Sequence, residues 1–298
     1  MTKVTKAIIP AAGFGTRFLP QTKAMPKEML PIIDKPIIQY VVEELVEAGI
    51  KDIIIVGSSN KRSIEDHFDL PSEELLANLR AGGEKKAPYI AQIEAIADMA
   101  NFVYVRQKGP YGNATPLLSA AHLIGDEPFI YKWADDFFKA ETSAIKQLIA
   151  TYEQHDGGVF ACKRITRDDE YSSYGIAAGD VIDDATIRMS HIDEKPGKEK
   201  AQSNLASVSG YLLPGGIMSY VEAGLEQYDP SQGEFTFQPF VQQMIDAGES
   251  FYAREIVGGT FYDTGDKLEY LKTTIDFGLE HPELGKELRA YISERLKK

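Results

Sequence analysis

A glycine-rich stretch near the start of the chain carries residue types suited to binding an anionic ligand. Residues 8–31 read IIPAAGFGTRFLPQTKAMPKEMLP, in which an apolar run is followed by Gly13, Gly15, Arg17 and then Lys27. Small residues allow a ligand to approach the backbone closely, and the arginine and lysine supply positive charge. The pattern predicts a turn that binds an anion such as a phosphate.

Two familiar glycine motifs fit this turn poorly. A dinucleotide-binding fingerprint has a glycine three residues after its second one, where this chain has Phe18, and a Walker A loop ends in Gly-Lys-Ser/Thr, which the turn does not contain. The remaining interpretation is a loop whose backbone amides surround a triphosphate while Arg17 and Lys27 neutralise it. A plain strand-to-helix turn with surface cations is the alternative for the two glycines taken alone.

Composition limits the classes of protein to which the chain can belong. Its 298 residues include 32 Lys and Arg against 45 Asp and Glu, a formal charge of −13, which argues against a nucleic-acid-binding surface. The single cysteine, Cys162, excludes an intrachain disulfide framework and a multi-cysteine zinc site. We find no apolar run long enough for a membrane span and no signal-peptide pattern. We therefore expect a cytoplasmic globular protein without membrane or nucleic-acid partners.

Apolar periodicity predicts strands that alternate with helices along the chain. Strands are expected in VTKAIIPA, KDIIIVGSS, NFVYVRQ, EPFIYKWADD and GGVFACKRI, separated by helices such as KPIIQYVVEELVEAGI and SAIKQLIATYEQH. Such alternation predicts a doubly wound α/β fold, in which helices cover both faces of a mostly parallel sheet. Ligands bind at the carboxyl ends of the strands in such sheets, which is where the glycine-rich turn, Gln107 and the pair Asp135 and Asp136 fall. Trp133 and Cys162, inside predicted strands, are expected in the core.

Three further segments are predicted to elaborate this fold. Residues 70–100 read as a polar, helix-rich insertion, and the short strands expected from Tyr171 onward suit a small β-rich substrate subdomain over about 171–240. Residues 267–298 read as C-terminal helices with apolar faces, which suit contacts between subunits. We expect the main domain to occupy residues 1–266.

A series of motifs extends over nearly the whole chain. The segment AAGFGTRFLPQTKAMPKEMLPIIDKPIIQYVVEELVEAGI is followed in order by RQKGPYG, IGDEPFIYKWADD, DEKP, NLASVSGYLL, GEF and FYDTGDKLEYLK. This series resembles the sugar-nucleotide pyrophosphorylases, in particular the bacterial UTP:glucose-1-phosphate uridylyltransferases. The resemblance implies a Rossmann-like nucleotidyltransferase fold and an enzyme that forms UDP-glucose and pyrophosphate from UTP and glucose 1-phosphate. It also implies Mg²⁺ as the cofactor and a homo-oligomer, commonly a dimer or tetramer.

The resemblance also assigns roles to individual residues. In the family's reaction an oxygen of the sugar phosphate attacks the α-phosphorus of the nucleotide, so cations and a metal must offset the repulsion between two anions. Arg17 and Lys27 match the catalytic positions that hold the triphosphate, and Asp135 and Asp263 match the metal-binding acids. The other matched positions bind the nucleotide (Ala11, Ala12, Gly13, Gly15, Gln107 and Gly112) or the sugar phosphate (Gly175, Glu194, Lys195 and Gly210).

Two of these roles have a direct chemical rationale. The side-chain amide of Gln107 carries both a donor and an acceptor, as does the edge of uracil, so it suits reading that base. The ammonium of Lys195 is a compact point charge that suits a phosphate.

The chain departs from the family pattern in two loops. Residues 110–116 read PYGNATP where relatives have Pro-Leu-Gly-x-Gly-His-Ala, and residues 236–239 read TFQP where they have Gln-Leu-Thr-Asp. These departures leave open the same reaction with dTTP or with another sugar 1-phosphate. A catalytically silent sensor of nucleotide sugars is the alternative from a different class. The joint presence of Arg17, Lys27 and the metal acids argues against it, because a sensor needs no metal site.

Overall fold

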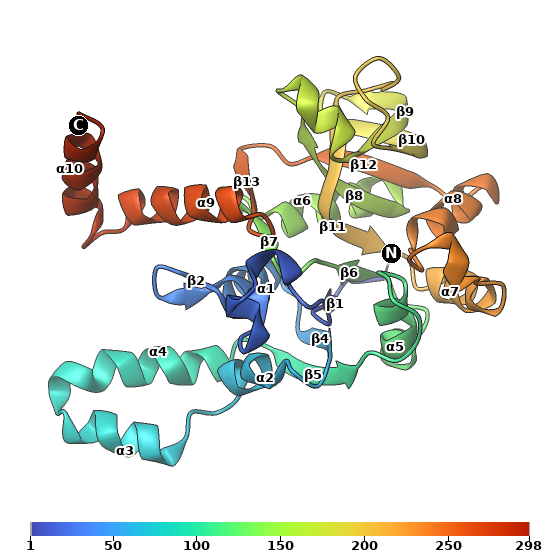
Figure 1. The fold of residues 1–298 in the computed structure, drawn as a ribbon. Coiled ribbons are helices and arrows are strands. Elements are labelled where there is room, and N and C mark those ends of the chain that lie inside the picture. The colour runs from blue at the N-terminus through green and yellow to red at the C-terminus, as the bar shows by residue number, and fades with distance from the viewer. Residues whose placement is uncertain (1, 298) are drawn as a thin grey trace.

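The computed structural model describes residues 2–297, which fold around one large sheet with helices on both faces (Figure 1). The strands are Lys6–Pro10 (β1), Pro31–Ile32 (β2), Lys35–Pro36 (β3), Asp52–Gly57 (β4), Asn101–Arg106 (β5), Phe129–Tyr131 (β6), Asp136–Ala140 (β7), Gly158–Arg164 (β8), Gly175–Asp183 (β9), Thr186–Glu194 (β10), Leu205–Leu213 (β11), Phe251–Glu255 (β12) and Gly259–Asp263 (β13). The α-helices are Ile37–Glu47 (α1), Arg62–Phe68 (α2), Glu73–Ala81 (α3), Ala87–Ala97 (α4), Thr115–Ile124 (α5), Ala144–His155 (α6), Ile217–Glu226 (α7), Gln238–Asp246 (α8), Lys267–Glu280 (α9) and Gly285–Arg295 (α10). Short 3₁₀ helices lie at Thr16–Phe18 (η1), Gln21–Lys23 (η2), Lys27–Met29 (η3), Glu84–Lys86 (η4), Asp168–Ser172 (η5) and Pro230–Gln232 (η6).

The large sheet has nine strands in the order β5-β4-β1-β6-β11-β8-β12-β10-β9. Neighbours from β5 to β6 are parallel, as are β8 and β12. Strand β11 runs antiparallel to β6 and β8, and β10 runs antiparallel to β12 and β9. The expected parallel arrangement therefore holds for the first half of the sheet, while the whole sheet is mixed. Periodicity identified these segments as strands but carries no information on which partner each one finds.

Alternate side chains of the central strands enter two separate cores. Ala7 and Ile9 of β1 belong to one hydrophobic cluster, and Ile8 between them belongs to the other. The first core is covered by α1, α2, α4 and α6, and the second by α5, α7 and α8. Helices on both faces are what the doubly wound prediction requires, and that prediction is confirmed.

The segments predicted to elaborate the fold form regular elements. Helices α3 and α4 occupy the expected insertion at residues 70–100 and extend away from the sheet, as do the C-terminal helices α9 and α10 (Figure 1). Strands β9 and β10 extend the edge of the large sheet. Leu268, Leu271 and Ile275 of α9 are exposed, so an oligomer that buries them stays a prediction. Within residues 2–297, no helix is both long and apolar enough to cross a membrane.

The strand expected in EPFIYKWADD is shorter than predicted. It ends at Tyr131, and only the backbone N–H of Lys132 still pairs with β1, through the carbonyl of Ile8 at 3.1 Å. Trp133 therefore lies in a loop, half-buried, instead of in the core as expected, whereas Cys162 in β8 is fully buried as expected. The early end of β6 leaves a loop that presents Asp135.

Candidate active site

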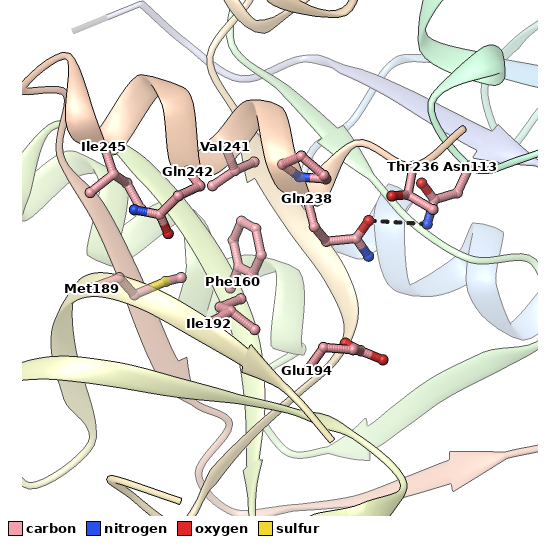
Figure 2. Close-up of a pocket in the computed structure, with 11 residues that line it drawn as sticks. Asn113, Phe160, Met189, Ile192, Glu194, Thr236, Gln238, Val241, Gln242 and Ile245 are labelled. Atoms are coloured by element: carbon pink, nitrogen blue, oxygen red, sulfur yellow. Dashed lines mark hydrogen bonds between the residues drawn. The ribbon is translucent and has the colours of Figure 1, made fainter. Parts of the chain in front are cut away.

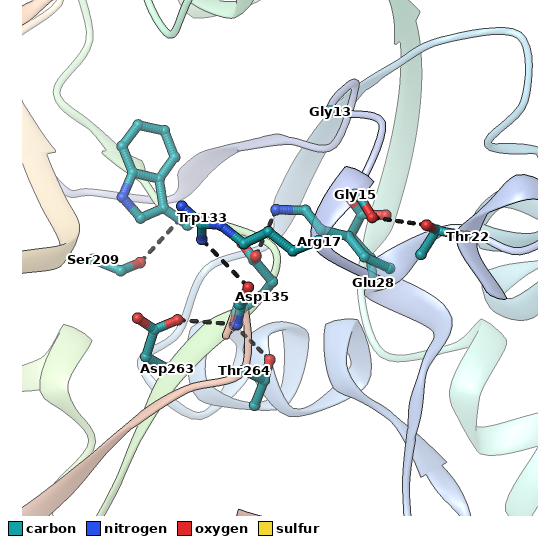
Figure 3. A network of polar contacts seen from close by, with 12 residues as sticks. Gly13, Gly15, Arg17, Thr22, Glu28, Trp133, Asp135, Ser209, Asp263 and Thr264 are labelled. Carbon is teal, nitrogen blue, oxygen red and sulfur yellow. Dashed lines mark hydrogen bonds and ion pairs between the residues drawn. The ribbon is translucent and has the colours of Figure 1, made fainter. Parts of the chain in front are cut away.

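A pocket of about 660 Å³ lies at the carboxyl ends of β1, β4, β5 and β6. This is the edge at which open α/β sheets bind ligands, and a volume of this size suits a small-molecule ligand. Figure 3 shows Arg17, Asp135 and Asp263 gathered here. The lining residues are Pro10, Ala12, Gly13, Phe14, Arg17, Lys27, Glu28, Ser58, Gln107, Gly109, Tyr111, Gly112, Asn113, Pro116, Trp133, Asp135 and Glu234.

The glycine-rich turn after β1 has a backbone conformation that requires glycine. Gly15 has a φ of +62°, and a Cβ there would lie 3.0 Å from Cβ of Lys27 and 3.2 Å from Cγ2 of Thr22. The Thr22 hydroxyl donates to the Gly15 carbonyl at 2.7 Å. Because the turn packs tightly on Lys27, the glycines place Arg17 and Lys27 on the same side of the pocket.

Lys27 and Asp135 form an ion pair across the pocket. Their Nζ and Oδ2 atoms are 2.5 Å apart, and both side chains are largely buried. Burial by itself lowers the pKa of Lys27, but attraction to Asp135, Glu28 and Asp136 outweighs it, so the pKa lies above its ordinary value. Lys27 is therefore fully charged at neutral pH and suited to binding an anion.

Asp135 and Asp263 approach the same short backbone segment after β13. A Cβ on Gly265 would lie 2.9 Å from Oδ2 of Asp135 and 3.2 Å from Oδ1 of Asp263. The N–H of Gly265 donates to Asp263, and its carbonyl accepts from Arg17 at 3.3 Å. Burial, followed by repulsion from Asp135, raises the pKa of Asp263. A cation between the two carboxylates would relieve this repulsion.

These two acids fit a magnesium ion, which takes one or two carboxylates together with phosphate oxygens and waters. Among residues 2–297 no group of three His, Cys, Asp or Glu side chains forms a metal site of protein ligands alone. Asp136 is buried and faces Lys132, whose Nζ lies 3.4 Å from its Oδ1. Burial raises the pKa of Asp136 to about 7. The Asp136 carboxylate is thus already paired with the ammonium of Lys132.

The predicted nucleotide-binding residues divide into those that line the pocket and those that support it. Ala12, Gly13, Gln107 and Gly112 line it. At Gly112 a Cβ would come within 2.1 Å of the Phe235 carbonyl oxygen, so this glycine allows the chain around residue 235 to cross close by. Ala11 is buried, and its N–H continues the β1–β4 pairing by donating to Val56 at 2.8 Å, so it supports the turn from below.

A second pocket, of about 510 Å³, adjoins the first and shares Asn113 with it (Figure 2). Glu194 lines it and pairs in register with Gly175, where a Cβ would lie 3.2 Å from its Oε2. Lys195 follows directly, with its Nζ 3.6 Å from Glu194 Oε1 and its side chain more than half exposed. The other lining residues are Phe160, Met189, Ile192, Thr236, Gln238, Pro239, Val241, Gln242 and Ile245.

Gly210, the fourth residue predicted to bind the sugar phosphate, does not lie with the other three. It lies in an irregular part of β11, where a Cβ would point toward Ala161 at 3.4 Å and toward Ile145 in the core. It is not among the described residues that line either pocket. The structure thus gathers Gly175, Glu194 and Lys195 and places Gly210 on the core side of its strand.

A buried ion pair beneath the glycine-rich turn was missed from the sequence. Lys61 lies 2.8 Å from Oε2 of Glu28 and donates to the Gly13 carbonyl at 2.6 Å, and the two side chains are 3% and 1% exposed. Burial raises the pKa of Glu28, although Lys61 opposes the shift. Glu28 stands beside Lys27 in the motif, but nothing in the local pattern distinguishes Lys61 from a surface lysine. The pair joins the turn, η3 and the start of α2.

Comparisons with known proteins agree with this geometry. Residues 6–277 match the model of the nucleotidyl transferase family. The chain is 41% identical over 294 residues to a UTP–glucose-1-phosphate uridylyltransferase of Staphylococcus epidermidis, with 99% of each chain covered. It is 42% identical over 296 residues to the UTP–glucose-1-phosphate uridylyltransferase YngB of Bacillus subtilis, covering 99% of this chain and 97% of that one.

Solved structures give the same result. The UTP-bound UGPase from Acinetobacter baumannii superimposes with a TM-score of 0.87 at 34% identity, covering 98% of this chain and 99% of that one. A UDP-glucose pyrophosphorylase in complex with UDP-glucose superimposes with a TM-score of 0.79 at 33% identity, covering 92% and 98% of the two chains.

We predict that Lys61→Met strongly destabilises the protein. The substitution removes the ammonium that pairs directly with the buried Glu28 carboxylate, and breaking such a buried pair typically lowers the free energy of unfolding by about 3–5 kcal/mol. Urea unfolding followed by circular dichroism measures this loss. Lys51→Met, the same change at an exposed lysine, should stay within about 0.5 kcal/mol. Adding Glu28→Gln should restore part of the stability, and a loss no larger than in the Lys51 control would contradict the prediction.

Proposed function

The chain belongs to the nucleotidyl transferase family, and from this premise we propose that it transfers a uridylyl group from UTP to glucose 1-phosphate, forming UDP-glucose and releasing pyrophosphate. One observation carries the proposal. Arg17, Lys27, Asp135 and Asp263 come from three distant parts of the chain and meet at the carboxyl edge of the sheet. Two cations and two acids this close together suit a reaction between two phosphates, whose mutual repulsion is the main obstacle.

In this proposal the nucleotide occupies the first pocket. The backbone of Ala12, Gly13 and Gly15 surrounds the triphosphate, and Arg17 and Lys27 hold its charged oxygens. Gln107, which directly follows β5 and lines the pocket, binds the edge of uracil through its side-chain amide. As the bond to the α-phosphorus breaks, negative charge grows on the departing pyrophosphate, and the two fixed cations stabilise that charge without having to reorganise.

Asp135 and Asp263 would hold Mg²⁺ in this proposal. A bound Mg²⁺ neutralises phosphate charge and polarises the phosphorus–oxygen bonds. Asp135 contacts Lys27 at 2.5 Å, so the acid and the cation that serve the same phosphates also fix each other's direction. The pair thereby orients the α-phosphate for attack from the opposite side to the leaving group.

The sugar phosphate is assigned to the side where the two pockets join. Glu194 accepts hydrogen bonds from sugar hydroxyls, with the backbone of Gly175 close by, and Lys195 binds the phosphate. Lys195 has a φ of +49°, and its N–H donates to the Tyr174 carbonyl at 3.2 Å, which holds this turn in place. We extend the proposal to a homo-oligomer formed through the C-terminal helices, with residues 1–266 as the catalytic domain.

Substrate assays test the proposed function directly. We expect pyrophosphate release with Mg²⁺, UTP and glucose 1-phosphate, strong rejection of ATP and GTP, and a smaller preference of UTP over dTTP. A single methyl or hydroxyl is worth roughly 1–3 kcal/mol, while a mismatched base edge leaves buried groups unpaired. The measurement is a matrix of initial rates for five nucleotides (UTP, dTTP, CTP, ATP and GTP) against glucose, galactose and N-acetylglucosamine 1-phosphates.

The same matrix separates the alternatives. A purine nucleotide as the best substrate would contradict the role of Gln107, and dTTP as the best would replace UTP in the proposal. If no combination releases pyrophosphate while UDP-glucose still binds, the protein is the silent sensor.

We predict that Asp135→Asn nearly abolishes turnover while the fold stays intact. The amide has the same volume and can still accept a hydrogen bond from Lys27, but it is a poor ligand for Mg²⁺. Steady-state rates over a range of Mg²⁺ concentrations measure the loss, and circular dichroism checks the fold. Asp126→Asn, at an exposed turn, is the matched control and should behave as wild type. Near-normal activity of Asp135→Asn at limiting Mg²⁺ would remove Asp135 from the metal site.

We predict that Lys195→Ala weakens the use of glucose 1-phosphate much more than the use of UTP. A charge-assisted contact of about 2 kcal/mol corresponds to a roughly 30-fold higher KM for the sugar phosphate. Lys198→Ala is the control, since Lys198 lies three residues away and pairs with Asp168 at the surface. Equal losses toward both substrates would place Lys195 outside the sugar-phosphate site.

A further inference from the structure

Lys132 is fully buried at a position where the strand pattern calls for an apolar side chain. Its relative exposure is 0%, and it directly follows the buried residues Phe129–Tyr131 of β6. Ile130 belongs to the core under α1 and Tyr131 to the opposite core, so alternation turns Lys132 back toward α1. An apolar residue would fill this space without the free energy needed to bury a charge.

The ammonium of Lys132 joins three separate elements. It donates to the Asp136 carbonyl at 2.9 Å at the start of β7, and to the Ser209 hydroxyl at 3.1 Å in β11. On its third side lies Oε2 of Glu44 in α1, at 3.6 Å. Every strong contact of this lysine therefore fixes backbone or buried side chains around the loop from Trp133 to Asp136.

Ser209 connects the same lysine to the other end of that loop. Its hydroxyl oxygen also accepts from the N–H of Trp133 at 3.1 Å, an interaction drawn in Figure 3. Asp135 lies between these two ends of the loop. Its backbone carbonyl accepts hydrogen bonds from the N–H and the hydroxyl of Thr264, at 3.1 and 2.5 Å. The loop thus has a fixed backbone partner at Trp133, at Asp135 and at Asp136.

We propose that Lys132 and Ser209 are positioning residues that fix the loop Trp133–Asp136 and thereby aim the Asp135 carboxylate into the pocket. The inference rests on the proposed function, since it concerns the residue assigned there to the metal. Lys132 is not among the described residues that line either pocket. Residues that orient a metal ligand typically affect metal affinity or activity by about 10- to 100-fold when they are removed.

The test uses two changes that remove the network without leaving a lone buried charge. Ser209→Ala deletes the hydroxyl that joins Lys132 to Trp133. The triple variant Lys132→Met, Glu44→Gln and Asp136→Asn replaces the ammonium by an apolar chain of similar length and neutralises both acids that face it, because Lys132→Met alone risks unfolding. Ser143→Ala is the matched control: Ser143 is a buried serine whose hydroxyl accepts from the N–H of Lys146 and caps α6. The hydroxyl also donates to the backbone carbonyl of Glu44 at 3.5 Å, but it contacts neither Lys132 nor the loop, so its loss lowers stability while both keep their other contacts.

Two readouts distinguish positioning from a general effect on folding. The first is Mn²⁺ binding to the full-length protein in the presence of UDP-glucose, measured by isothermal titration calorimetry. The second is kcat and KM for UTP with glucose 1-phosphate. We expect roughly tenfold weaker Mn²⁺ binding and a similar fall in kcat for both variants, with little change in the KM for UTP. The Ser143→Ala control should match wild type in both measurements.

The possible results have separate meanings. Wild-type Mn²⁺ affinity and kcat in both variants would overturn the positioning role, and so would equal losses in Ser143→Ala. If the wild-type protein neither binds Mn²⁺ nor releases pyrophosphate, the proposed function fails first, and the positioning role falls with it.

Discussion

The ion pair between Lys27 and Asp135 is the interaction on which the arrangement of the site depends. It joins residues 108 positions apart, at the glycine-rich turn and in the loop after β6. A pocket that binds two phosphates needs both cations and metal-binding acids, and such groups attract one another as soon as they are placed close together. The tight contact of Gly15 with the Lys27 side chain fixes the position of Lys27. The loop after β6 fixes the position of Asp135, so the ion pair joins the glycine-rich turn to this loop.

Two further, buried lysines support this pair in the same way, each through the acid next to one of its members. Lys61 contacts Glu28, the neighbour of Lys27, and Lys132 contacts Asp136, the neighbour of Asp135. Buried ion pairs contribute little net stability compared with apolar packing, because both charges must be desolvated. Their effect is to restrict geometry, since a buried charge tolerates few alternative positions. The two buried lysines also offset part of the unfavourable energy of the acids beside them, since Lys61 opposes the upward pKa shift of Glu28 and Lys132 opposes that of Asp136.

How far the sequence predicts this structure depends on whether a residue acts through local or distant contacts. The turn at Gly15 and the cations at 17 and 27 are local, and their pattern indicated an anion site before any fold was known. In the sequence, Lys61 resembles an ordinary surface lysine, and Lys132 is a charged residue next to an apolar strand. Their roles depend on distant partners, since Lys61 pairs with Glu28, 33 residues away, and Lys132 donates to Ser209, 77 residues away. The strand order could not be predicted from the sequence either, since β11 lies between β6 and β8 through pairing with segments far away in the chain.

The two loops that depart from the family pattern contact each other, and this bears on which substrate they affect. Asn113 lines both pockets, and its side chain accepts from the N–H of Phe237 at 2.9 Å and donates to Gln238 at 3.4 Å. Thr115, which stands where relatives have histidine, is fully buried and donates to the Pro110 carbonyl at 2.6 Å. Thr115 thus closes its own loop and is not among the described residues that line either pocket. The departures therefore change the junction between the pockets, where the sugar is assigned, while Gln107 and the glycine-rich turn keep the features that favour a pyrimidine nucleotide.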